Sequence, residues 1–232
     1  MQFVCDETGL TYELKRSSRR RTLAIQIGSS GLQVHAPLYL DQQLITAFVV
    51  KKQAWIRQHL SAQVAPVNHV ARGRLPLLDG ELSLRQVRDD LTATTRDGDE
   101  LWVQISHRVK AANVEATVKQ QLISWYTQQA QSWFAGRIAV YAKRMSVQPG
   151  ALLIKGWQTK WGSCHTDGTI SLNWRLMLAP SWVADYVVVH ELAHLVHMNH
   201  GDAYWQLVQQ HYPQWQDAKG WLKVNQQKLN LI

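Results

Sequence analysis

Two histidines and a glutamate in the last quarter of the chain have the spacing of a metal site. The segment Val187–His200 reads VVVHELAHLVHMNH and contains His190, Glu191 and His194 in the pattern His-Glu-x-x-His. On an α-helix each residue turns by about 100°, so the two imidazoles lie one turn apart on one face and can reach a single ion. Glu191 lies beside them and can contact a metal-bound water without binding the metal. This pattern is typical of a zinc hydrolase.

A third ligand is needed, because zinc sites hold the ion with at least three protein side chains. No glutamate follows His194, but three histidines do: His197, His200 and His211. His197 lies on the same helix face but about 10.5 Å along the axis from His190, too far for one ion. Asn199 and Gly201 tolerate a left-handed backbone, so the chain can turn back and bring His200 to the metal. We therefore predict His190, His194 and His200 as ligands, with His197 beside them or toward the substrate.

The same segment also fits a buried helix with two incidental histidines. The adjacent glutamate and the further histidines argue against that reading. Val188, Val189 and Leu192 fall on the arc opposite the histidines. The helix is therefore expected to bury its back in the core and to turn its ligands into a cleft.

The composition is that of a folded protein without membrane segments. Of the 232 residues, 46% are hydrophobic, which is ample for a core. The first ten residues, MQFVCDETGL, lack the apolar stretch of a signal peptide, and no apolar run is long enough to span a bilayer. Cys5 and Cys164 make no disulfide framework. These features favour a cytoplasmic protein that does not contact membranes.

The net charge of +8 favours anionic partners or substrates. Part of this charge is concentrated in the run Lys15–Arg21, which reads KRSSRRR. The run is either a solvated turn or an anion-binding patch that contacts nucleic acid through Arg19, Arg20 and Arg21.

The first half of the chain is predicted to form a small α/β-sheet domain over residues 1–110. Alternating apolar residues indicate strands at 11–15, 22–27 and 32–35, with a hairpin turn at Gly28–Gly31. A helix is expected from Asp41 to about Ala62, followed by a loop over 66–80. Further strands are expected at 82–87, 91–95 and 101–105.

The second half, residues 111–232, is predicted to carry the metal site, which makes the fold class α+β. A long helix is expected from Asn113 to about Arg144. A strand over 152–157, the segment Lys160–His165 (KWGSCH) and a strand over 169–176 then lead into the metal helix. Because the connection after this hairpin is short, we expect it to form one wall of the active site.

The strand Thr169–Asn173 is expected to be an edge that binds an extended substrate. Its alternation places Ser171 and Asn173 on one face, toward the cleft rim. Arg175 follows and could hold an anionic group, while Tyr204, His211 or Tyr212 could stabilise an oxyanion. Cys164 is expected to pack within the KWGSC turn.

The blocks KWGSC, ISLNWRLMLAP and DYVVVHELAHLVHMNHGDAYW together resemble the YgjP-like family of zincin-like metal-dependent hydrolases, also called DUF45 or WLM-related. The basic strands, the AWIRQHL segment and the long Trp-rich helix extend the resemblance over nearly the whole chain. It implies a zincin-like catalytic half with an HExxH active-site helix, in which the two histidines of HELAH and the histidine of NH bind zinc and Glu191 is catalytic. It also implies kinship with SprT-type proteases, which act near DNA.

The leading hypothesis is a zinc-dependent metallopeptidase, with Zn²⁺ or another divalent transition metal, in which Glu191 activates a zinc-bound water. The substrate-binding residues would be Ser171, Asn173, Arg175, Tyr204 and His197. One alternative is a metal-dependent phosphohydrolase that acts on nucleotides or another anionic small molecule, with a pyrophosphatase-type reaction. Another is a nucleic-acid-associated SprT-like protease.

Overall fold

The structure is a computed structural model that describes residues 2–28, 31–61 and 67–231. The chain divides into two compact units, Met1–Pro66 and Val67–Ile232. The boundary expected near residue 110 therefore falls inside the second unit. No helix in the described ranges is both long and apolar enough to cross a membrane.

The first unit consists of a four-stranded sheet and two helices. The sheet has the order β1-β2-β4-β3, with β2 and β4 parallel and the other pairs antiparallel. Its elements are β1 (Gln2–Cys5), β2 (Leu10–Ser17), β3 (Ala24–Gly28), β4 (Gly31–Pro37), α1 (Gln42–Lys51) and α2 (Gln53–Ser61). Tyr12 and Val34 from the sheet share one core with Ile45, Val49 and Ile56 from the helices.

The expected hairpin and helix of this unit are present with modifications. Strands β3 and β4 pair antiparallel, while Ser29 and Ser30 of the turn lie outside the described residues. Asp41 begins α1 by accepting a hydrogen bond from the backbone N–H of Gln43 at 2.8 Å. The helical region is divided at Lys52, which lies outside α-helical geometry, and its expected end at Ala62 lies outside the described residues.

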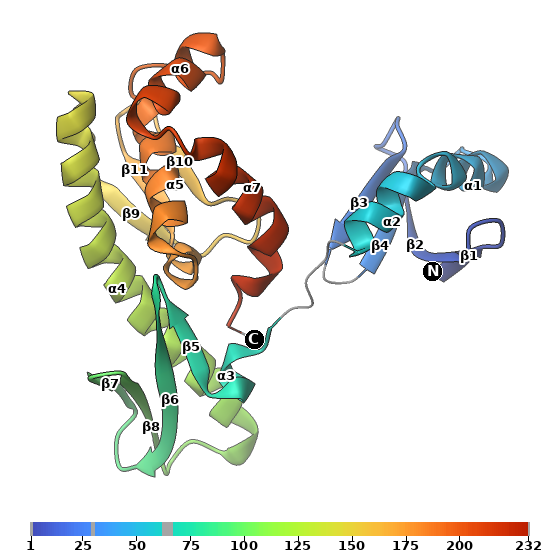
Figure 1. Ribbon diagram of the computed structural model, residues 1–232. Helices are drawn as coiled ribbons and strands as arrows, with labels where there is room; N and C mark the ends of the chain where they lie inside the picture. Colours follow the sequence, from blue (N-terminus) through green and yellow to red (C-terminus); the bar gives the residue numbers. More distant parts are fainter. Residues whose placement is uncertain (1, 29–30, 62–66, 232) are drawn as a thin grey trace. The chain divides into compact units, whose positions relative to one another are not determined.

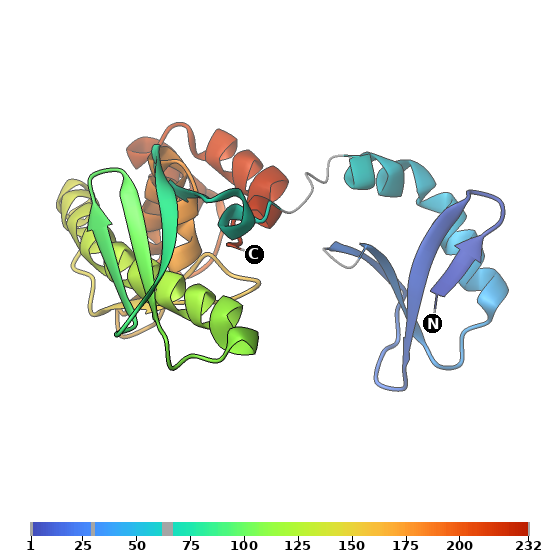
Figure 2. The ribbon, with the colours of Figure 1, turned by 90° about the horizontal axis from the view of Figure 1, so that it is seen from below.

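The second unit begins with another four-stranded sheet, of order β5-β6-β8-β7, in which β6 and β8 are parallel. Its elements are α3 (His69–Arg72), β5 (Arg74–Leu77), β6 (Gly80–Asp89), β7 (Ala93–Asp97) and β8 (Glu100–Ser106). The loop expected over 66–80 is thus partly structured. The sheet lies against the first half of the long helix α4 (Val114–Met145), which follows the 3₁₀ turn η1 (Ala111–Asn113) (Figure 2).

Helix α4 explains why the chain does not divide near residue 110. Its first half packs on β7 and β8, and it also contacts β9 and α5. Leu101 and Val103 of β8 therefore belong to the same core as Val118, Leu122 and Phe134 of α4. One continuous core stabilises both parts.

The remaining elements surround α5 (Ser181–Ala193), which carries the His-Glu-x-x-His motif. They are β9 (Leu152–Lys155), β10 (Gly162–Cys164), β11 (Ile170–Asn173), η2 (Trp174–Leu178), α6 (Asp202–His211), α7 (Trp215–Asn225) and η3 (Gln226–Lys228). The strand order is β10-β11-β9. Helix α5 contacts α4, α6, α7 and β10 (Figure 1). It is therefore buried on most sides rather than on one apolar face.

Two polar side chains tie α4 to α5. The Arg137 guanidinium donates to both carboxylate oxygens of Asp185, and the Tyr141 hydroxyl donates to the same carboxylate. Asp185 lies in α5 and is only 8% exposed. A buried carboxylate needs such partners, because an unpaired charge in the interior is costly. The pair thus fixes the helix that presents the histidines.

Candidate active site

Three histidine rings converge where α5 ends. His190 lies in the last turn of α5, and His194 follows directly as the residue that ends the helix. The chain turns over the next residues, and His200 stands just before α6. One ring nitrogen from each histidine lies within 4.8 Å of the others. Among the described residues, no other histidine, cysteine or carboxylate joins this group.

The separation of two of the three rings fits a zinc ion. The Nε2 atoms of His190 and His200 are 3.3 Å apart. Two nitrogens that bind one tetrahedral Zn²⁺ at 2.0–2.1 Å are separated by about 3.3–3.4 Å. His194 Nδ1 lies 3.0 Å from the backbone carbonyl oxygen of His197. A proton on Nδ1 would be held there, which leaves Nε2 free to bind metal. His197 thus supports the group through its main chain.

The environments of His190 and His200 favour the neutral imidazole, which is the form that binds metal. Burial, followed by the neighbouring His194, His200 and Lys219, lowers the pKa of His190 to about 3. Burial is also the largest cause that lowers the pKa of His200. His190 Nδ1 is buried and has no hydrogen-bond partner among the described residues.

Tyr204 of α6 packs against all three histidines. Its ring centroid lies 4.7 Å from that of His194, 4.8 Å from that of His200 and 5.4 Å from that of His190. Its hydroxyl donates to the His190 carbonyl oxygen at 2.9 Å. That carbonyl lies in the last turn of α5, where helical carbonyls lack partners within the helix. Tyr204 therefore supports both the rings and the helix end.

A second aromatic contact holds the ring of His200, which comes from a loop. Trp205 stacks on His200 at a centroid distance of 5.7 Å and on Trp215 of α7 at 4.3 Å. The Lys219 ammonium lies 4.7 Å from the centre of the Trp205 ring, a favourable cation–π arrangement. This stack links the histidine group to α7.

Glu191 is buried next to this group, with 4% of its surface exposed. Its carboxylate lies over Gly162 of β10, where a Cβ would approach Oε1 to 2.4 Å. Burial raises the pKa of Glu191 to about 8, and the charge of Lys160 opposes this shift. A carboxylate with a pKa near neutral can both accept and return a proton.

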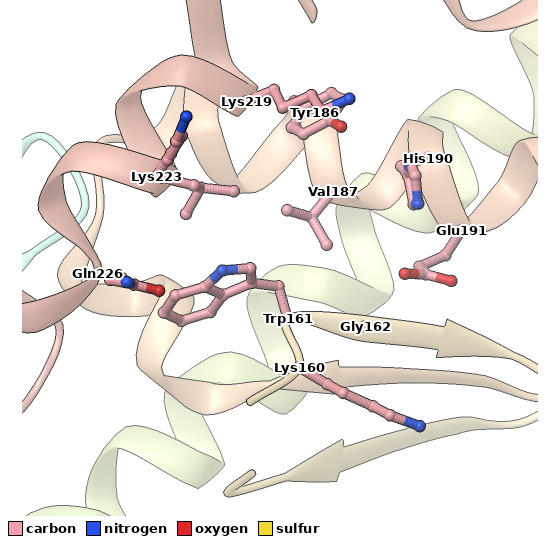
Figure 3. A pocket seen from close by; sticks show the side chains of 11 residues that line it. Lys160, Trp161, Gly162, Tyr186, Val187, His190, Glu191, Lys219, Lys223 and Gln226 are labelled. Carbon is pink, nitrogen blue, oxygen red and sulfur yellow. The ribbon is translucent and has the colours of Figure 1, made fainter. Parts of the chain in front are cut away.

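A pocket of about 340 Å³ opens beside His190 and Glu191 (Figure 3). Figure 3 shows Tyr186 and Lys219 on one side and Trp161 and Gly162 on the other. The full lining is Lys160, Trp161, Gly162, Tyr186, Val187, His190, Glu191, Lys219, Leu222, Lys223 and Gln226. A buried proton acceptor, a histidine group and a cleft are therefore contiguous.

The prediction that Ser171 and Asn173 bind substrate from an edge strand is wrong. Strand β11 is the centre of its sheet, because β9 pairs with it in parallel on the side away from β10. Both side chains are 1% exposed. The Asn173 side-chain amide instead donates to the carbonyl oxygens of Trp157 and Lys160. Asn173 thus holds the loop that leads into β10.

Two further residues expected to contact the substrate have structural contacts. Arg175 donates to the Asn230 side chain and to the Trp157 carbonyl, and its guanidinium lies 4.7 Å from the centre of the Trp174 ring. Tyr204 is fully buried, and its hydroxyl is engaged as described above. The Tyr204 hydroxyl is therefore not available to an oxyanion, and Nε and Nη1 of Arg175 are used within the fold.

None of the remaining sequence candidates belongs to the histidine group. The backbone after β2 turns at Ser18 and Arg19, and Arg19 and Arg21 are exposed. The Tyr212 hydroxyl donates to the Trp182 carbonyl oxygen. Burial, with Glu191 and Asp167 as further causes, raises the pKa of Cys164 to about 11, so its thiol stays protonated and poorly nucleophilic.

Several site residues were missed from the sequence. Tyr186 lies four residues before His190, and this spacing could have placed it on the ligand side of the helix. The contact of Gly162 with Glu191 depends on tertiary packing, which the sequence pattern does not show. The same holds for Trp161, Lys219 and Lys223, which are brought to the pocket by elements far apart in the sequence.

One of three comparisons with known proteins identifies a family for this chain. Among curated proteins, none is similar enough to count as a relative. Among solved structures, the metallopeptidase zymogen of Pyrococcus abyssi abylysin is similar to part of the chain, with 18% identity and a TM-score of 0.38; the match covers 43% of this chain and 99% of that one. The model of the YgjP-like metallopeptidase domain matches residues 21–225, and the chain therefore belongs to the YgjP-like metallopeptidase family.

Proposed function

We propose that this protein is a zinc-dependent metallopeptidase in which His190, His194 and His200 hold the ion and Glu191 transfers the proton. The observation that carries the proposal is the 3.3 Å separation of the His190 and His200 Nε2 atoms beside a buried carboxylate. Family membership supports the reaction class. The separation of the His190 and His200 nitrogens, which matches that of two ligands on one tetrahedral zinc ion, supports zinc as the metal. The neutral state of His190 also supports it.

A bound Zn²⁺ ion would lower the pKa of a water molecule and polarise a carbonyl oxygen. Glu191 is placed to take the proton from the attacking water and to pass it to the leaving amine. Its burial favours this role, because a carboxyl with a raised pKa holds the proton between the two transfers. Gly162 leaves room for the carboxylate at this position.

Strand β10 offers a backbone edge for an extended peptide. Among the described strands it pairs only with β11. The hydrogen bonds from Asn173 N–H to the Trp161 carbonyl and from His165 N–H to the Thr169 carbonyl set the alternation of the ladder. The backbone groups of Gly162 and Cys164 consequently point away from β11. A substrate paired there would lie next to Glu191.

A test combines metal analysis with a peptide-cleavage assay. The full-length protein, loaded with zinc, should cleave members of a quenched-fluorescent peptide library. Glu191→Gln preserves the shape of the side chain but removes the proton acceptor, so it should keep its zinc and lose a factor of about 10² or more in rate. Near-normal turnover by the zinc-replete variant would contradict the mechanism.

A nucleotide phosphohydrolase is the competing function, and one observation favours it: three lysines line the pocket. Arg175, the other cation considered for that role, is engaged by Asn230 and Trp157. A nucleotide panel in the same assay separates the two functions. Release of phosphate or pyrophosphate that requires Glu191, without peptide cleavage, would select the phosphohydrolase.

A further inference from the structure

The pocket beside Glu191 has an excess of positive charge. Lys160, Lys219 and Lys223 line it, and Glu191 is the one acidic residue in the lining. Within the part of the chain that the structure describes, none of the three lysines forms an ion pair with a carboxylate. Their charges are therefore available to a ligand.

Two of these lysines belong to one face of a helix. Lys219 and Lys223 are four residues apart on α7, so their side chains emerge one turn from each other. Lys219 is held by its cation–π contacts with Trp205 and Trp215. In Figure 3, Lys219 lies near Tyr186 and Lys223 lies farther from His190, both on the side of the pocket opposite Trp161.

The space between these charges is apolar. Val187 of α5 and Leu222 of α7 contribute aliphatic side chains, and the Trp161 indole forms the opposite side. A volume of about 340 Å³ is at the small end of ligand pockets. The pocket therefore suits one short chain of methylenes that ends in a negative charge.

We infer that this pocket is a specificity site for a carboxylate close to the scissile bond of a peptide, bound by Lys219 and Lys223 with the aliphatic part against Val187 and Trp161. The carboxylate is either an acidic side chain or the C-terminal carboxylate of the peptide. This inference rests on the proposed peptidase function and adds its substrate class.

A carboxylate fits the pocket better than a polyphosphate. No arginine lines the walls, although arginine is the residue that binds phosphate in a bidentate manner. The apolar walls, by contrast, match the methylenes of glutamate.

Binding measurements on the zinc-loaded, full-length Glu191→Gln protein test the pocket without turnover. The probes are hexapeptides of one sequence, acetylated and amidated, with Glu, Gln or Lys placed at each position in turn. A further peptide has a free C-terminus. At one position the Glu peptide, or else the peptide with the free C-terminus, should bind about tenfold more tightly than its neutral counterpart. Two partly exposed ion pairs with lysine are sufficient for an effect of this size. Tight binding of a peptide with Glu at one position indicates an acidic side chain, whereas tight binding of the peptide with the free C-terminus indicates the terminal carboxylate.

The variant Lys219→Gln/Lys223→Gln should remove this preference, and Lys219→Glu/Lys223→Glu should favour the Lys peptide instead. Lys143→Gln, an exposed lysine at the end of α4, is the matched control and should leave the preference unchanged. Circular dichroism and zinc content confirm that each variant is folded and loaded.

Equal affinity for the Glu, Gln, Lys and free-acid peptides would overturn the inference, as would a preference that survives the double substitution. Lysine-dependent binding of inorganic tripolyphosphate without a carboxylate preference would overturn it in favour of a phosphate pocket. Cleavage assays keep the two proposals separate. Peptides cut without charge preference refute the pocket alone, whereas lysine-dependent carboxylate binding without any cleavage refutes the peptidase function alone.

Discussion

The carboxylate of Glu191 occupies the space that a side chain at Gly162 would need. A Cβ at that position would lie 2.4 Å from Oε1, 2.7 Å from Cγ and 2.8 Å from Cδ of Glu191. Gly162 does not have a positive φ, so the backbone conformation does not require a glycine there. The requirement comes from the buried carboxylate, which has little room to retreat.

Gly162→Ala should therefore displace Glu191 and lower kcat by a factor of about 10² or more, since a small misplacement of a catalytic group has a large effect. The fold and the zinc content should be retained. Gly136→Ala is the control, because a Cβ there meets nothing within 4 Å in α4; it should leave activity unchanged and stabilise by about 0.5–1 kcal/mol. Wild-type kcat in Gly162→Ala would show that the Glu191 position is not critical.

The three-histidine set predicts different outcomes for two neighbouring histidines. His200→Ala should lose zinc, because its Nε2 faces that of His190. His197→Ala should keep it, because the contact of His197 with His194 is made by the backbone carbonyl, which alanine also has. Metal analysis after dialysis against a weak chelator measures both. If His200→Ala kept its full zinc content and His197→Ala lost zinc, then His197 and not His200 would be the third ligand.

Local patterns in the sequence were sufficient to predict the helix that carries the motif and the long helix that packs against it. The helix expected over 113–144 is α4, Val114–Met145, because its apolar residues repeat with helical period over about nine turns. The turn after His194 is present, but neither Asn199 nor Gly201 has the left-handed backbone that the sequence argument invoked, and Gly201 is extended. The mixed α+β fold class was predicted from the same helix and strand patterns.

These local patterns could not predict which strands pair when the strands are far apart in the sequence. Alternation in 169–173 correctly assigned Ile170 and Leu172 to a buried face, but it carries no information on what covers the other face. The parallel partner β9 lies well before β11 in the sequence, and it makes β11 a central strand. The domain boundary failed for a similar reason, because α4 joins two sheets that the sequence shows as separate.

The basic turn of the first unit should bind polyanions. Arg16 is engaged with the carbonyls of Leu38 and Leu40, so it is structural, whereas Arg19 and Arg21 are exposed. Replacing Arg19, Arg20 and Arg21 by Ser should weaken DNA binding and reduce its salt slope by up to about 3. Fluorescence anisotropy at several salt concentrations measures both. Unchanged affinity with a large drop in Tm would give the run a structural role instead.

Tyr204→Phe isolates the hydroxyl that supports the end of α5. The substitution keeps the ring against the three histidines but leaves the His190 carbonyl without its partner. A buried unsatisfied carbonyl costs about 1–3 kcal/mol, so the free energy of unfolding of the metal-free protein should fall by that amount.

Zinc affinity should fall less in Tyr204→Phe than in Tyr204→Ala, because alanine also removes the ring and opens a cavity beneath all three imidazoles. Urea unfolding and competition with a chromogenic chelator give the two quantities. Tyr39→Phe is the control, since Tyr39 is 77% exposed and its hydroxyl loses only contact with solvent. If Tyr204→Phe matches this control in both measurements, the hydroxyl does not hold the helix end, and packing of the ring alone positions His190.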